Sequence, residues 1–180
     1  MWVINVSTVR QHDHDDAPTT TTRQAGAATL RVAGAPVAGA HTSVEQAAPH
    51  GVRLRFEVPA VAGCVPHIRM VVADLAERHG ASRDLLADIR LAVTEACANV
   101  VVHAYEGHDE QGRLTVDAEV GTDASLLVRV CDDGRGMAAA SGTPGLGLGM
   151  GLITSLTDSF LVRSELGRGA EMRLTFNLHR

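Results

Sequence analysis

The chain has 180 residues, of which 45% are hydrophobic and 21% charged, and its formal net charge is −5. This length supports one domain with a sizeable core, and the composition is that of an ordinary globular protein. The sequence has no run of about 18 apolar residues that could span a membrane. Its first six residues lack the basic start and long apolar core of a secretion signal. These features predict a cytoplasmic protein without membrane contact, and the negative charge argues against direct nucleic-acid binding.

Two residue types narrow the possible chemistry. All 16 basic residues are arginines, so the chain has no lysine. This excludes the P-loop lysine, the strand lysine of eukaryotic-type protein kinases, and Schiff-base or pyridoxal phosphate chemistry. The three cysteines, Cys64, Cys97 and Cys131, lie far apart in apolar stretches. We therefore expect reduced core thiols rather than a disulfide framework or a zinc site.

Residues 1–50 differ in composition from the rest of the chain. They hold four consecutive threonines, many alanines and glycines, and no sustained hydrophobic period. Such a segment buries too little apolar surface to offset its ordering entropy, so we expect a mostly disordered N-terminal tail before a domain at 51–180. The run His12-Asp13-His14-Asp15-Asp16 could bind a transition metal loosely. A solvated tail is the preferred interpretation, because no further ligands stand at useful spacing.

From Gly51 onward the hydrophobic periodicity predicts alternating strands and helices. Apolar residues recur at every second position in the expected strands and at helical spacing in the expected helices. In chain order these are a strand at 52–58, helices at 65–79 and from a Ser82 cap to about 105, strands at 113–120 and 125–131, a glycine-rich segment at 134–151, a short helix to about 157, and strands at 160–165 and 170–178. Consecutive strands with helices grouped between them predict an α+β two-layer sandwich.

The second expected helix carries one polar stripe on an otherwise apolar surface. Glu95, Asn99 and His103 follow each other at intervals of four residues, so they share one face. A solvent-facing stripe is one interpretation. The other is a reactive pair, because an amide oxygen can ligate Mg²⁺ and a carboxylate can accept a proton.

The sequence Asp132-Asp133-Gly134-Arg135-Gly136 directly follows a strand. A carboxylate at a strand's end accepts strongly from an exocyclic amine such as that of adenine, and glycines let backbone approach a ligand. A simple turn between strands would have the same sequence.

Alternate glycines occupy the segment before the third expected helix. Gly145, Gly147, Gly149 and Gly151 would expose successive backbone N–H groups at the positive end of that helix. This arrangement forms an anion site that needs no lysine. A flexible linker is the alternative interpretation.

Taken together, the three motifs resemble the nucleotide-binding boxes of the GHKL ATPases, which share the Bergerat fold. The order is Glu95-x-x-x-Asn99, Asp132-x-Gly134-x-Gly136 and Gly147-x-Gly149-x-Gly151. The stretch from Arg90 to Tyr105 is similar to the first box of the anti-sigma factor serine/threonine kinases typified by bacterial RsbW and SpoIIAB. The resemblance covers about residues 52–178. It implies a two-layer fold with a mixed, mainly antiparallel sheet covered by helices on one face.

The resemblance also implies a role for each motif residue. Glu95 is then the catalytic base, Asn99 the ligand of Mg²⁺ and Asp132 the contact to the adenine amino group of ATP. The glycines shape the pocket and the lid beside the phosphates: Gly134, Gly136, Gly147, Gly149 and Gly151. His103 is frequent in this family's first helix, and a structural histidine is the equal alternative. The family's G-x-G-T sequence is here Gly167-Arg168-Gly169-Ala170, which predicts weaker nucleotide binding without the threonine hydroxyl.

By this resemblance the chain is expected to be an ATP- and Mg²⁺-dependent protein serine/threonine kinase and anti-sigma factor. It would sequester a sigma factor, phosphorylate a STAS-type anti-anti-sigma antagonist, and form a homodimer through the sheet edge near Val52–Val58. A short lid of ten residues between Gly136 and Gly147 fits this family. The alternative is a non-catalytic ATP-binding module that docks partners. A gyrase-like ATPase switch is disfavoured, because the sequence shows no transducer domain.

Overall fold

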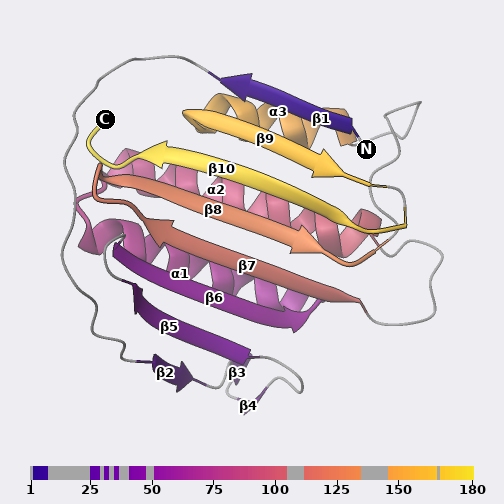
Figure 1. Cartoon of the computed structure of the whole chain (residues 1–180), viewed down its shortest axis with the longest axis horizontal. Coiled ribbons are helices and arrows are strands. Elements are labelled where there is room, and N and C mark those ends of the chain that lie inside the picture. The colour runs from indigo at the N-terminus through magenta and orange to yellow at the C-terminus, as the bar shows by residue number, and fades with distance from the viewer. Residues whose placement is uncertain are drawn as a thin grey trace.

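The computed structural model describes residues 2–7, 25–28, 31–32, 35–36, 41–47, 51–104, 112–134, 146–165 and 167–180. The described chain forms two layers, a twisted antiparallel sheet and a set of helices against one of its faces (Figure 1). This confirms the predicted α+β sandwich.

Five strands form the central part of the sheet, in the order β9-β10-β8-β7-β6. Their bounds are β6 (Gly51–Pro59), β7 (Arg113–Val120), β8 (Ser125–Asp132), β9 (Ser159–Ser164) and β10 (Ala170–Asn177). Burial alternates along β8, β9 and β10 and, apart from the buried Asp117, along β7, so one face is covered while the other is more exposed. All pairings among described strands are antiparallel, whereas the resemblance implied a mixed sheet.

The helix layer consists of α1 (Val65–Arg78), α2 (Arg83–Asn99) and α3 (Leu146–Leu156), with a short 3₁₀ turn η1 (Ala62–Cys64) before α1. Helix α2 begins as predicted at Ser82, whose Oγ accepts a hydrogen bond from the Leu85 amide at 3.3 Å. It lies in the middle of the layer and packs against both α1 and α3. The chain continues from α2 into a π-helix, η2 (Val100–Ala104).

One hydrophobic core fills the space between the two layers. Its largest fully buried side chains come from strands, helices and the chain end alike: Phe56, Phe176, Ile68, Ile89, Leu114, Leu126, Ile153, Met172, Leu174, Leu178 and Val58. Cys64 and Cys97 are buried in this core and free, as the sequence predicted. Cys131 is also free but half-buried, because it projects from the opposite face of β8.

Residues 1–50, which the sequence predicts to be a disordered tail, contain five strands in the described structure. Strand β1 (Trp2–Ser7) pairs with β9, while β5 (His41–Ala47) pairs with β6 and β2 (Ala25–Ala28) with β5. Strands β3 (Arg31–Val32) and β4 (Ala35–Pro36) form a separate ribbon. The rest of this range lies outside the described residues, so the domain boundary at residue 50 stays a prediction. The expected dimer edge is altered, because β6 already has a strand neighbour on each side.

Candidate nucleotide-binding site

The site begins where helix α2 meets helix α3. Glu95 and Asn99 lie one turn apart on α2, and both face Gly149 of α3. A methyl group on Gly149 would lie 3.3 Å from Glu95 Oε2 and 3.6 Å from Asn99 Oδ1. Two motifs separated by fifty residues therefore lie side by side, and a side chain at Gly149 would crowd the Glu95 carboxylate.

The amide of Asn99 is incompletely satisfied within the described structure. Its Nδ2 atom is buried and has no hydrogen-bond partner there. An unpaired buried polar group is destabilising, and such groups occur at sites that bind a ligand or an ion. The orphaned Nδ2 can donate to a phosphate oxygen, while Oδ1 of the same amide and the Glu95 carboxylate one turn away are oxygen atoms of the kind that a hard cation takes.

Helix α2 does not continue regularly to His103. The π-helix η2 takes over at Val100, and its i→i+5 bonds hold more residues per turn than an α-helix. The regular stripe predicted from four-residue spacing thus ends at Asn99. The same π turn brings Ala104 against the glycine turn after β8, where a methyl group on Gly134 would lie 2.3 Å from the Ala104 carbonyl oxygen.

Asp132 is the last residue of β8 and is held by two neighbouring segments. Its Oδ1 accepts a hydrogen bond from the Gly134 amide at 3.0 Å. On its other side lies Gly169, at a positive φ of 82°, where a methyl group would lie 2.0 Å from the Asp132 carbonyl oxygen. Only glycine fits both this backbone angle and this close approach. Asp132 also borders two open cavities of about 290 and 190 Å³, but their other lining residues belong to strand ends and to the sheet face opposite the helices, and neither Glu95 nor Asn99 is among them.

Burial raises the pKa of Asp132 above its ordinary value of 3.8. Backbone hydrogen bonds from Gly134 and Ala170 oppose this rise, and the neighbouring charge of Asp133 adds to it. The carboxylate is thus partly desolvated yet held by backbone donors, which suits an acceptor for a ligand amine.

The structure gathers the motif residues into two groups, and no contact in the described structure joins Asp132 directly to Glu95 or Asn99. Glu95 and Asn99 meet Gly149, and Gly134 shapes the turn of Asp132. Gly151 lies on the same helix but is exposed, with open space where a side chain would be. Gly136 lies outside the described residues. Gly147, Gly149 and Gly151 are within α3 and do not precede it, because the helix begins at Leu146.

Sequence reasoning missed two supporting residues, Ala104 and Gly169. In the sequence, Gly169 stands out only as part of the altered G-x-G-T motif. The pair of glycines in that motif, Gly167 and Gly169, was the signal that could have pointed to it. In the described part of the chain no three His, Cys, Asp or Glu side chains are grouped to hold a metal. No described helix is long and apolar enough to cross a membrane.

Comparison with known proteins agrees with this geometry. The chain is 28% identical over 130 residues to the serine-protein kinase RsbW of Bacillus mycoides, covering 64% of this chain and 79% of that protein. It is 31% identical over 129 residues to RsbW of Staphylococcus epidermidis, covering 63% and 80%.

A solved structure supports the fold alone. The blue-light activated histidine kinase of Erythrobacter litoralis superposes with a TM-score of 0.50 at 21% identity, over 67% of this chain and 42% of that longer one. The family model of the histidine kinase-like ATPase domain matches residues 58–176, a range that holds both layers of the fold and every motif described above. The chain therefore belongs to the histidine kinase-like ATPase domain family.

Proposed function

We propose that this protein is an ATP-dependent protein serine/threonine kinase that also acts as an anti-sigma factor. Its substrate would be a serine or threonine of a STAS-type anti-anti-sigma protein, and its second partner a sigma factor that it sequesters. The observation that supports this most is the contact of Glu95 and Asn99 with Gly149. The relatives named as serine-protein kinases give the substrate class. We further propose that it works in the cytoplasm as a homodimer.

In this mechanism the chain supplies a base and positions the nucleotide. Glu95 accepts the proton of the partner's hydroxyl as the hydroxyl oxygen bonds to the γ-phosphorus of ATP. The bond between the γ-phosphorus and the bridging oxygen then breaks, and ADP leaves. Mg²⁺, which Asn99 would hold, neutralises charge on the phosphates when bound.

Adenine recognition falls to the turn after β8. Asp132 would accept a hydrogen bond from the exocyclic amine, and Gly134 and Gly169 fix the position of its backbone. The first amides of α3 lie at the positive end of that helix, close to Glu95 and Asn99, where phosphate oxygens are favoured. The turn after β8 would thus bind the adenine ring, and helix α3 would bind the phosphates.

The test is incubation of the protein with γ-labelled ATP, Mg²⁺ and purified STAS-domain proteins encoded near its gene. We expect label on a serine or threonine of one of these proteins. The same proteins carrying alanine at that position are the control. Binding of ATP without any transfer to protein would instead support the non-catalytic docking module.

A further inference from the structure

The sheet face opposite the helices carries a dense set of charged side chains. Helices α1, α2 and α3 all lie on the other face, so among the described elements none covers this one (Figure 1). Six arginines and four acidic residues project from the five central strands onto it: Arg53, Arg55, Arg113, Arg129, Arg163 and Arg173, against Glu57, Asp117, Glu119 and Glu171. This face is positive in a chain whose net charge is −5.

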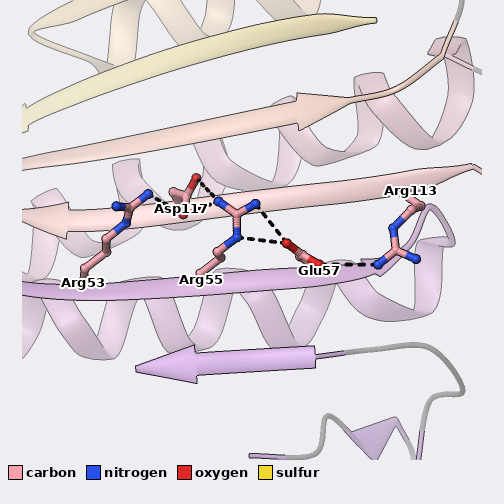
Figure 2. Close-up of polar contacts among 5 residues, drawn as sticks. All are labelled: Arg53, Arg55, Glu57, Arg113 and Asp117. Carbon is pink, nitrogen blue, oxygen red and sulfur yellow. Dashed lines mark hydrogen bonds and ion pairs between the residues drawn. The ribbon is translucent and has the colours of Figure 1, made fainter. Parts of the chain in front are cut away.

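One half of the face is a connected ion network on β6 and β7 (Figure 2). The Asp117 carboxylate, 8% exposed, binds Arg53 and Arg55 at 3.1 Å each. Glu57 joins Arg55 at 2.9 Å to Arg113 at 3.5 Å. The hydrogen bond to Glu57, aided by the charge of Asp117, raises the pKa of Arg55, so its guanidinium stays charged. Here the acidic residues are already engaged by arginines of the same chain.

The other half, on β8 and β10, has positive charge left over. Arg129 is directly opposite Asp117 in the β7–β8 register, but that carboxylate is bound by Arg53 and Arg55. On its other side Arg129 is opposite Arg173. No hydrogen bond or ion pair of the Arg129 side chain is formed within the described structure, and Arg173 is paired with Glu171. Arg129 is thus the arginine of this pair left without a partner in the described structure, and the like charge of Arg173 directly across the sheet favours an anion beside it.

We propose that Arg129 and Arg173 form the centre of a docking surface for an acidic segment of a partner protein. Arginine is the cation best suited to bind carboxylates at an interface, and the partly buried Leu127 and Leu161 beside the pair add apolar contact. This surface is on the face away from Glu95 and Asn99, so it does not depend on the proposed kinase reaction.

Two other occupants fit the charges less well. A second copy placed two-fold on this centre would bring four arginines together. A nucleic-acid backbone would meet Glu119, Asp117 and Glu171, which are interspersed among the arginines and repel phosphate. A polypeptide can present carboxylates to the arginines and basic groups to the acidic residues.

The experiment measures binding of a fluorescein-labelled ten-residue peptide of glutamates with two interspersed lysines by anisotropy at low salt. Wild type should bind, and the affinity should fall as salt rises. Arg129→Glu with Arg173→Glu should weaken binding by at least about tenfold. Arg69→Glu with Arg90→Glu, on the exposed helix surface, changes the net charge equally and should lose less than about twofold.

A milder pair, Arg129→Thr with Arg173→Thr, keeps residues that fit a strand and tests the idea if the reversed pair fails to fold. Unchanged ADP affinity in each variant marks an intact fold. Equal losses in the helix-surface control would overturn the proposal, as would no binding by wild type. Tighter binding of a ten-nucleotide single-stranded RNA, lost in the same variants, would assign the surface to nucleic acid and overturn it too.

Discussion

Asp132 has opposite effects on folding and on the proposed binding of adenine. Because burial raises its pKa, the folded state favours the protonated carboxyl. The stabilisation that the protonated carboxyl gives to the folded state is complete at pH values below 3.8, its ordinary pKa. This stabilisation is lost as pH rises through the raised pKa of the folded state. At neutral pH the charged Asp132 therefore lowers the stability of the free protein, while in the proposed complex that same charge would accept the adenine amine.

Changing Asp132 to Asn should separate these two effects. We expect a higher melting temperature for the free variant at pH 7, with the difference from wild type shrinking toward pH 4. We also expect ADP binding to weaken by about 1–3 kcal/mol, the scale of a charged hydrogen bond left poorly made. Calorimetric titration measures the affinity, and a wild-type ADP affinity would contradict the assignment of Asp132 to adenine.

Asn99 is expected to act through the metal. Asn99→Ala removes the amide whose Nδ2 has no partner in the described structure. The loss should lower the Mg²⁺-dependent part of ATP affinity, while Mg²⁺-free ADP binding changes little. ATP titrations with Mg²⁺ and with EDTA measure this difference, and equal losses under both conditions would argue against a metal ligand.

At the scale of elements, Gly149 is the residue of α3 that lies beside Glu95 and Asn99 of α2. Gly149→Ala places a methyl 3.3 Å from Glu95 Oε2, whereas Gly151→Ala places one in open space on the same helix. Both changes raise helix propensity by up to about 1 kcal/mol. A displacement of the reacting groups can reduce the rate by about 10²-fold, so phosphoryl transfer should fall much further in Gly149→Ala than in Gly151→Ala.

Melting temperatures and transfer rates of the two variants provide the measurement. Gly151→Ala should gain more stability than Gly149→Ala, because its methyl meets no neighbour. Equal transfer rates in the two variants would show that the contact of α3 with Glu95 does not matter for the reaction.

Periodicity predicted the elements from Gly51 onward to within a few residues, because each has one apolar face against the core. The sequence predicted that the third helix begins after residue 151, whereas α3 begins at Leu146. Four glycines in eight residues have low helix propensity, so local sequence gives no sign of this earlier start. Packing of α3 against α2 explains it. The π turn after Asn99 has no periodic signature either. The contact of Gly169 with Asp132 joins residues 37 apart, and nothing local in the sequence encodes that approach.

The sequence predicted which residues form the candidate site, but only the structure shows which of them are neighbours. Spacing alone put Glu95 and Asn99 on one face, but taken by itself it favoured a solvent-facing stripe. The contact with Gly149 favours the functional interpretation, because a purely exposed stripe would not meet another motif.

At the scale of the whole molecule, every proposed site residue lies beyond residue 50. Deleting residues 1–50 should therefore leave ADP affinity nearly unchanged, whereas loss of the β1–β9 and β5–β6 pairings should lower the melting temperature. Strands β1 and β5 add edges to a sheet whose central five strands hold the core. Calorimetry and thermal melting of the shortened protein check this. Hydrogen exchange of the full chain distinguishes the two expectations for this range: protection within β2 and β5 supports the paired strands, and rapid exchange there supports the disordered tail predicted from composition.

The central claim is that one site in this molecule binds nucleotide and uses Glu95 to transfer its phosphoryl group. The direct measurement is the rate of label transfer from ATP to the STAS-domain substrate by Glu95→Ala, with ADP affinity measured on the same protein. Loss of a general base reduces the rate by about 10²–10⁴-fold, while Asp132 and its adenine contact are untouched. The account predicts near-normal ADP binding with that loss of transfer. Transfer by Glu95→Ala at the wild-type rate would contradict it.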